Sequence, residues 1–308
     1  MGTPAFAVPA LRSVAAACDV VRVVTQPDRP AGRGRASAAS AVAAEAASLG
    51  LPVSKPADMK EAEVRERLAA ERADVFAVVA FGAILTPDVL ALPRAGCINL
   101  HGSLLPDYRG ASPVQRALWD GRAGTGVCTI VMDDGVDTGD VVLSAREAIR
   151  DDDDAASLAA RLAELGAPLL AESCVLAHEG RAPRVPQDRA AGSYAKKLRK
   201  RDGAVDWALP ARETWCHARA VTPWPGATAG WTGRRLLLLA SRPVAGHGTP
   251  GSVLQVDAEG VTVACGDGAL CVTKVKPEGR GSLAAAEWAR GARLAVGDRL
   301  DGGKEFVS

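Results

Sequence analysis

Asn99 and His101 are the residues whose types and spacing point most directly to chemistry. They follow an apolar run, Gly96-Cys97-Ile98, that predicts a buried strand, and they precede a turn from Ser103 to Gly110. Side chains two positions apart on a strand project from the same face, so an amide and an imidazole should project together. An amide N–H stabilises a developing oxyanion, and an imidazole transfers protons near neutral pH. For this pair taken alone, a hydrogen-bonded strand end before a turn is the more common interpretation.

Two other segments could complete a site with this pair. An acidic, glycine-containing loop runs from Asp133 to Asp140 between two apolar strands, and Phe81-Gly82-Ala83-Ile84-Leu85 begins as the strand at 75–80 ends. In a parallel sheet, ligands bind beyond the carboxyl ends of the strands, so we expect all three segments to meet in one crevice. The acidic loop lacks the ligand spacing of a Ca²⁺ loop, and we expect no metal.

The elements that must position these residues alternate between strand and helix. Apolar runs predict strands at 20–25, 52–53, 75–80, 96–100, 126–133 and 141–148, and helical spacing predicts helices at 36–49, 61–71, 87–92, 113–120 and 155–179. This alternation is typical of an α/β domain with a parallel sheet covered on both faces. After residue 203, short strands at 236–240, 252–256, 261–265 and 270–275 predict a small antiparallel sheet or barrel.

Charge divides the chain in the same place. The 308 residues carry a net charge of only +1, which excludes a generally basic nucleic-acid coat, but residues 181–201 hold eight Lys or Arg and one acid. Such a segment indicates a localised contact with a polyanion, or equally a solvated linker. The sequence therefore predicts a first domain at 1–180, a basic linker at 181–203 and a β-rich second domain at 204–308.

Cysteine usage and hydropathy indicate the cellular compartment of the protein. Seven scattered cysteines without a Cys-x-x-Cys pair argue against a disulfide framework or a zinc site and favour a reducing environment. A secretory signal and a membrane-spanning apolar run are both lacking, which predicts a cytoplasmic protein.

Jointly, several motifs resemble those of the 10-formyltetrahydrofolate-dependent formyltransferases. They are Asn99-x-His101, Ser103-Leu104-Leu105-Pro106, Tyr108-Arg109-Gly110 and the Asp-Thr-Gly-Asp loop that contains Asp137. The resemblance implies a catalytic set of Asn99, His101 and Asp137, with 10-formyltetrahydrofolate as formyl donor and no metal. It implies that the donor is bound by Phe81, Gly82, Ile84, Leu85, Ser103, Leu104, Leu105, Pro106, Asp133 and Gly135.

Further motifs are similar to those of family members that formylate initiator methionyl-tRNA for translation. They are Gly2-Thr3-Pro4-x-Phe6, residues 25–34, residues 193–198, Asp206-Trp207, Pro223-Trp224-Pro225-Gly226 and residues 265–270. The similarity implies a monomer with a Rossmann-like, mostly parallel sheet domain and a C-terminal OB-like β-barrel that binds tRNA. The implied tRNA contacts are Arg29, Arg33 and Arg35 in a Pro/Gly-rich loop and Lys196, Lys197, Arg199, Lys200 and Arg201 in the linker. Arginine suits phosphates and base edges because its planar fork binds bidentately.

Two other functions remain open at this stage. One is a formyltransferase of the same fold that acts on a small amine, which would need neither the basic linker nor the Arg33 loop. The other is a nucleic-acid-binding protein without catalysis, which would have no use for Asn99, His101 and Asp137. Trp207, Trp215, Trp224 and Trp231 could stack on bases, although tryptophan in such a domain is more often core.

The N-terminus departs from the expected pattern. A parallel α/β domain normally opens on a strand, whereas Met1-Gly2-Thr3-Pro4 predicts a turn before a helix at 7–17. The resemblance places a central strand ahead of this turn. Without such a strand its neighbours should be left unpaired with apolar surface exposed, unless the start lies upstream.

Overall fold

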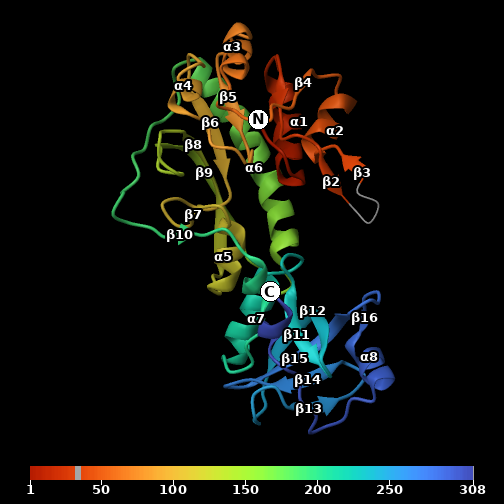
Figure 1. The fold of residues 1–308 in the computed structure, drawn as a ribbon. Coiled ribbons are helices and arrows are strands. Elements are labelled where there is room, and N and C mark those ends of the chain that lie inside the picture. Colours follow the sequence, from red (N-terminus) through yellow and green to blue (C-terminus); the bar gives the residue numbers. More distant parts are fainter. Residues whose placement is uncertain (32–35, 308) are drawn as a thin grey trace. The chain divides into compact units, whose positions relative to one another are not determined.

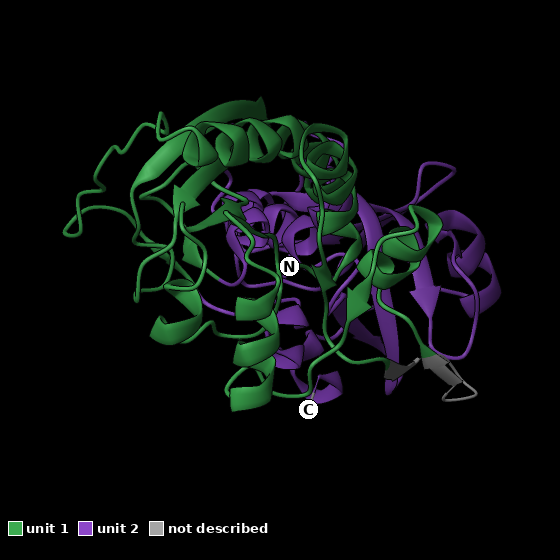
Figure 2. Ribbon diagram, turned by 90° about the horizontal axis from the view of Figure 1, so that it is seen from above, with its two compact units in different colours: residues 1–110, 125–148, 159–195 green, residues 111–124, 149–158, 196–308 purple. Residues whose placement is uncertain are grey.

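A computed structural model describes residues 1–31 and 36–307 of the chain (Figure 1). Contacts divide the chain into two compact units (Figure 2). The first contains residues 1–110, 125–148 and 159–195, and the second contains residues 111–124, 149–158 and 196–308. The family of motifs around Asn99 and His101 belongs to the first unit, and the cations of the predicted linker from Lys196 onward belong to the second.

A four-stranded sheet in the first unit carries the candidate site. Its order is β5 (Phe76–Val78), β6 (Cys97–His101), β8 (Gly124–Val131) and β9 (Val141–Ala148). Strand β6 runs parallel to β5 but antiparallel to β8, so the prediction of a parallel sheet is wrong at this pair. The reason is the route of the connection: residues 102–123, with β7 (Arg109–Gly110) and α5 (Pro113–Trp119), return the chain to the end of β6 at which it left, whereas a parallel neighbour needs a crossover to the strand's starting end.

Smaller strand pairs and helices surround this sheet. Strand β1 (Val23–Val24) pairs parallel with β4 (Val53–Ser54), and β7 (Arg109–Gly110) pairs parallel with β10 (Tyr194–Ala195). The helices are η1 (Ala5–Ala7), α1 (Val8–Ala17), α2 (Ala41–Ser48), α3 (Ala62–Ala70), α4 (Pro87–Leu90) and α6 (Ala155–His178). Among the described residues, no helix is both long enough and apolar enough to cross a membrane.

Most predicted elements of the first unit lie within a few residues of the observed ones. The clear error is the helix predicted from residue 36, because residues 36–38 form strand β3 (Ala36–Ala38) opposite β2 (Arg29–Ala31). The helix begins only after Ser40, whose Oγ accepts a hydrogen bond from the backbone N–H of Ala43 at 3.0 Å. A serine N-cap supplies a partner for one of the free donors at a helix start, which fixes the boundary there.

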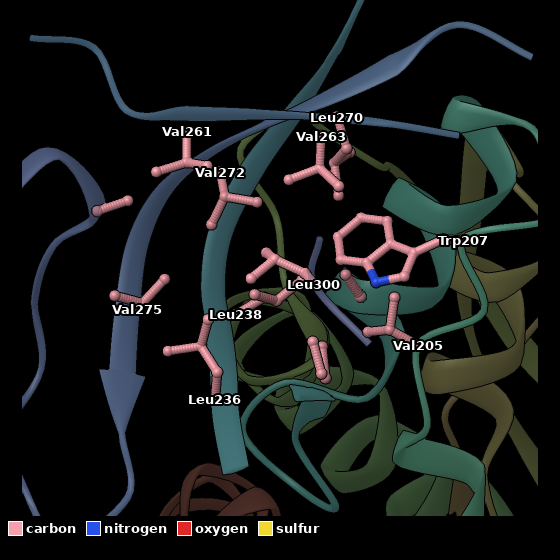
Figure 3. Close-up of a cluster of buried hydrophobic side chains, with 14 of the residues drawn as sticks. Val205, Trp207, Leu236, Leu238, Val261, Val263, Leu270, Val272, Val275 and Leu300 are labelled. Atoms are coloured by element: carbon pink, nitrogen blue, oxygen red, sulfur yellow. The ribbon is translucent and has the colours of Figure 1, made fainter. Parts of the chain in front are cut away.

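The second unit contains the predicted antiparallel sheet. Its order is β11 (Ala227–Trp231), β12 (Arg234–Val244), β15 (Ala269–Pro277), β14 (Val261–Ala264) and β13 (Val253–Val256), with β16 (Leu283–Ala284) beside β15. Helices α5 (Pro113–Trp119), α7 (Ala211–Ala220) and α8 (Ala285–Ala292) and turns η2 (Lys200–Gly203) and η3 (Gly303–Phe306) complete it. Leu236, Leu238, Leu270 and Leu300 lie in one buried cluster with Trp207 (Figure 3). The predictions missed β11, β16, α7 and α8.

Candidate active site

Strand β6 brings Asn99 and His101 to one face of the sheet. Asn99 pairs with Val78 of β5, and His101 lies opposite Cys128 of β8. Leu100, between them, points the other way and packs on α6, where a Cβ at Gly166 would lie 2.7 Å from its methyl groups. His101 is buried at 6% exposure. The two polar side chains therefore share the face opposite α6, as their spacing predicts.

Both ring nitrogens of His101 face a protein group. Nε2 lies 2.9 Å from the carbonyl oxygen of Tyr108, and Nδ1 lies 3.5 Å from Oδ2 of Asp137. A carbonyl only accepts hydrogen bonds, so Nε2 carries a proton and donates it to Tyr108. Nδ1 is then the nitrogen that gains or loses a proton, and that proton lies between the imidazole and a carboxylate. The arrangement forms an acid–base pair in a largely dry environment.

Asp137 is held in a fixed position by its loop. Its backbone has a left-handed φ of 56°, and its Oδ2 accepts a hydrogen bond from the N–H of Gly110 at 2.8 Å. Asp133 stabilises the start of the loop, because its Oδ1 accepts hydrogen bonds from Thr138 Oγ1 at 2.7 Å and from Gly135 N at 3.1 Å. A Cβ at Gly139 would overlap the carbonyl of Val131, so this approach requires glycine.

The loop reaches the site by a different route from the one predicted. Because β8 is antiparallel to β6, its last residues lie beside Ile98 rather than beside His101. The loop after β8 folds back toward His101 instead of being delivered by a parallel strand. The segments still meet, but the carboxyl ends of parallel strands do not account for it.

Gln187 was missed by the sequence analysis. Its Nε2 donates hydrogen bonds to the carbonyls of Asp137 at 2.9 Å and Gly139 at 2.7 Å. Its Oε1 accepts two hydrogen bonds from the buried guanidinium of Arg109, from Nε at 3.0 Å and from Nη2 at 2.9 Å. Gln187 therefore ties the Asp137 loop to the turn after His101. It stands in the segment assigned to a basic linker, where periodicity gives no signal.

The turn after β6 is also internally bonded. The buried Ser103 donates from Oγ to the carbonyl of Asp107 at 2.6 Å, and the N–H of Leu105 lies 3.4 Å from Sγ of Cys128. Leu104 packs against Gly126, and Leu105–Pro106 is a cis peptide bond. Burial raises the pKa of the Cys128 thiol, so the cysteine nearest His101 stays protonated and is a poor nucleophile.

The segment after β5 divides into a buried and an exposed part. Phe81 and Leu85 belong to a buried cluster with Phe76 and Val78, whereas Ile84 is 82% exposed. Val136, in the Asp137 loop, is 54% exposed. Apolar side chains displayed in this way are suited to contact a flat, apolar ligand surface. Gly82 has a φ of 81°, a backbone conformation that favours glycine.

The candidate polyanion-binding residues occupy two places. Arg33 and Arg35 lie outside the described residues, and Arg29 begins strand β2. The five cations on either side of the buried Leu198 are all exposed: Lys196, Lys197, Arg199, Lys200 and Arg201. Of the four tryptophans considered for stacking, Trp207 and Trp215 are buried and Trp231 packs against the core, whereas Trp224 is 54% exposed.

Within the described part of the chain, no three His, Cys, Asp or Glu side chains gather in a way that could hold a metal ion. All seven cysteines are free thiols.

Comparison with known proteins gives a consistent assignment. A formyl transferase family model matches residues 5–174, and a model of the formyl transferase C-terminal domain matches residues 197–293. The chain is 45% identical to a methionyl-tRNA formyltransferase of Dechloromonas aromatica over 97% of each chain, and 45% identical to one of Paracoccus denitrificans over 98% of each.

Solved structures show the same fold at lower identity. The crystal structure of an N-formyltransferase from Helicobacter canadensis superimposes with a TM-score of 0.66 at 16% identity, covering 88% of this chain and 96% of that one. The HypX protein of Aquifex aeolicus superimposes with a TM-score of 0.58 at 21% identity, covering 82% of this chain and 44% of that one. With both domain models and full-length relatives matched, the chain belongs to the methionyl-tRNA formyltransferase branch of the formyl transferase family.

Proposed function

We propose that this protein transfers the formyl group of 10-formyltetrahydrofolate to the α-amino group of initiator methionyl-tRNA. The observation that supports the chemistry is the acid–base pair of His101 and Asp137, together with Asn99, which lies on the same strand face as His101. The acceptor is supported by the full-length similarity to methionyl-tRNA formyltransferases and by the exposed cations at 196–201.

The three side chains divide the work of formyl transfer. Attack of a neutral amine on the formyl carbon forms a C–N bond and places negative charge on the formyl oxygen. Asn99 donates its amide N–H to that oxygen, and one such donor typically contributes about 3–4 kcal/mol to transition-state stabilisation. The amine must lose a proton, and the leaving nitrogen N10 of the folate must gain one.

Asp137 is the better placed of the pair to receive the proton of the amine. Its side chain is 17% exposed, whereas that of His101 is 6% exposed, so an incoming amine or a bridging water reaches the carboxylate first. His101, held by Tyr108 on its other side, stabilises charge on Asp137 and exchanges a proton with it. As the tetrahedral intermediate collapses, the bond from the formyl carbon to N10 breaks and the pair passes the proton taken from the amine to N10, which leaves as the neutral amine of tetrahydrofolate.

The folate-binding residues fit a flat heterocycle. Exposed Ile84 and Val136 supply apolar contact, and Gly82 with the internally bonded loop at 133–139 supplies a fixed backbone. Three buried residues support the folate site without facing the ligand: Phe81 and Leu85 pack beneath it, and Ser103 stabilises the turn. The sides of the site are formed by Leu104, Leu105, Pro106, Asp133 and Gly135.

The domain arrangement follows from the same proposal. Residues 1–180 form the catalytic domain, 181–203 a basic linker and 204–308 a tRNA-binding domain of OB-like form. Supporting the barrel form, Arg299 bridges Ser252 beside β13 and Asp301 bridges Gly230 of β11, so one segment contacts both edges of the sheet. The protein acts as a monomer in the cytoplasm, with Arg29, Arg33, Arg35 and the cations at 196–201 on tRNA phosphates.

The test is transfer of a radiolabelled formyl group. Purified protein, labelled 10-formyltetrahydrofolate and methionyl-tRNA should yield formyl-methionyl-tRNA, and Asp137→Asn should yield at least about 100-fold less per unit time. Labelling that persists at the wild-type rate in the variant would contradict the assigned chemistry.

A further inference from the structure

Residues 187–195, here called the strap, run alongside the turn that follows His101. Strand β10, at the end of the strap, pairs parallel with β7 of the turn. At Gly192, whose φ is 90°, an added Cβ would lie 2.1 Å from the carbonyl oxygen of Pro106. A side chain does not fit in that gap, so the backbones of the strap and the turn are in direct contact.

Ser193, within the strap, binds the backbone on both sides of Tyr108. Its Oγ accepts a hydrogen bond from the N–H of Tyr108 at 3.0 Å. Its carbonyl oxygen accepts a hydrogen bond from the N–H of Arg109 at 2.9 Å. The φ and ψ angles of a residue are fixed once the two peptide planes that flank it are fixed. Ser193 therefore holds the backbone conformation of Tyr108.

That conformation is one that a tyrosine does not favour by itself. Tyr108 has a φ of 60°, in the left-handed region. A residue other than glycine stays there only where its surroundings hold it. Ser103 contributes to this, because its Oγ donates to the carbonyl of Asp107, in the peptide that precedes Tyr108. As a result, the carbonyl oxygen of Tyr108 lies 2.9 Å from Nε2 of His101.

The Tyr108 carbonyl decides which nitrogen of His101 carries the proton. A neutral imidazole has one N–H, and two acceptors compete for it: the Tyr108 carbonyl at Nε2 and the Asp137 carboxylate at Nδ1. A proton on Nε2 leaves Nδ1 bare, so that it can accept the proton that Asp137 takes from the amine. A proton on Nδ1 would be held by Asp137 instead, and the pair could not take up another.

We propose that Ser193 is a positioning residue, which holds the Tyr108 carbonyl against Nε2 and so keeps Nδ1 of His101 free to accept a proton. The inference rests on the proposed function for its use in catalysis, but the arrangement of protons exists without substrate. Gln187, at the other end of the strap, bonds the Asp137 loop. One segment therefore positions both members of the acid–base pair.

The experiment replaces Ser193 and measures the proton arrangement directly. Nitrogen NMR of the unliganded protein with labelled histidine, in alkaline buffer where imidazole is neutral, distinguishes protonated from bare ring nitrogens. The spectrum of His101→Gln identifies the His101 signals. Ser193→Ala removes one hydroxyl from an exposed position, so the ratio of the Nε2–H to the Nδ1–H form should fall about fivefold or more.

Kinetics of the same variant separate positioning from binding. In Ser193→Ala, kcat should fall about five- to tenfold, while KM for both substrates should change less than about twofold. Ser193→Thr retains the hydroxyl and should restore both the NMR ratio and kcat.

A second variant displaces the strap without removing a hydrogen-bonding side chain. Gly192→Ala places a methyl group against the Pro106 carbonyl, and should lower the NMR ratio at least as much as Ser193→Ala. Gly180→Ala is the matched control. Gly180 also has a left-handed φ, of 69°, but beyond its chain neighbours an added Cβ would meet no described atom within 4 Å. This control should leave the ratio and kcat unchanged.

Four results would overturn the proposal. They are a wild-type protein with the proton mainly on Nδ1, an unchanged ratio in both Ser193→Ala and Gly192→Ala, a fall in kcat at the wild-type ratio, and a raised KM at unchanged kcat. A lowered ratio that Ser193→Thr does not restore would exclude the hydroxyl as the cause. Since the NMR ratio needs no substrate, a wild-type protein that transfers no formyl group would contradict the proposed function and leave this measurement intact.

Discussion

At the scale of single residues, Asn99 and His101 could be selected from sequence because strand alternation is a local rule. Gln187 could not, because its role comes from two carbonyls about fifty positions earlier in the chain. The same holds for Tyr108, whose backbone carbonyl orients His101 and leaves no mark in residue type. Long-range bonds of this kind appear only once the chain is folded.

The proposed catalytic roles of Asn99 and His101 predict a separation of turnover from binding. Asn99→Ala and His101→Gln should each lower kcat by about 100-fold or more, because in the proposed mechanism each removes a group that stabilises charge or moves a proton during transfer. Affinity for methionyl-tRNA, measured by filter binding, should change less than about twofold. A parallel loss of affinity would assign these residues to tRNA binding instead.

Gln187 predicts a positioning effect on Asp137. Gln187→Ala removes the two hydrogen bonds that hold the Asp137 loop, so kcat should fall by about tenfold and the pH–rate profile should shift. Gln187→Glu retains the length of the side chain but loses its donor, and should resemble the alanine variant. Gln255→Ala, at an exposed side chain that bonds Asp257, is the matched control and should leave both readouts unchanged. A lowered Tm with an unchanged pH profile would indicate a structural role only.

At the scale of elements, the sequence predicted where strands and helices occur better than it predicted the direction of a strand or its pairing partners. Apolar runs identified β8 and β9, but the antiparallel direction of β8 depends on how the turn and α5 return the chain. The strand at 36–38 was predicted as helix because alanine favours helices locally, and pairing with residues 29–31 overrides that preference. In α7, five of ten residues are charged, aromatic or His, which obscured a helix whose inner face is buried.

The exposed Trp224 and the buried Trp207 predict different effects of replacement by alanine. Trp224 is exposed in the loop between α7 and β11, and Pro225 beside it packs near Gly203, which follows Lys200 and Arg201. Stacking on a base contributes about 1–3 kcal/mol, so Trp224→Ala should weaken tRNA binding by about 5- to 100-fold without lowering Tm. Trp207→Ala should instead destabilise the fold by about 3–5 kcal/mol, because its ring is buried. Denaturant titration and tRNA binding of both variants distinguish a tryptophan that binds tRNA from one that stabilises the core. Normal tRNA affinity of the Trp224→Ala variant would exclude Trp224 from the proposed interface.

At the scale of the whole molecule, the balanced net charge concealed the uneven distribution that matters. Five exposed cations between 196 and 201 belong to the second unit, while Asn99, His101 and Asp137 belong to the first. The sequence predicted both features but not the exchange of segments that places 111–124 and 149–158 in the second unit. That exchange depends on packing of α5 against α7, which periodicity does not encode.

The stability of the chain should depend on pH through its first residue. The pKa of the buried Met1 amine falls from 8.0 to about 6 on folding, so the unfolded chain binds more protons between these values. Stability should therefore rise from pH 6 to pH 8, by at most about 3 kcal/mol, and level off above pH 8. The pKa of His217 is lowered by burial, which adds a loss of stability below its ordinary value of 6.5. A variant that carries Gly-Ser-Gly-Ser-Gly ahead of Met1 has no free amine at Met1, so its Tm should change less than that of the unextended chain between pH 7 and pH 8, and an equal slope in both chains would contradict this origin.

The most direct test of the central claim is the choice of acceptor. Formyl transfer from 10-formyltetrahydrofolate should be measured by kcat/KM on methionyl-tRNA, free methionine methyl ester, an amino sugar nucleotide and glycinamide ribonucleotide, with the same enzyme preparation. We predict that methionyl-tRNA exceeds every small amine by at least about 1,000-fold, since only tRNA engages the cations at 196–201. Transfer to a small amine at an equal or greater kcat/KM would contradict the account.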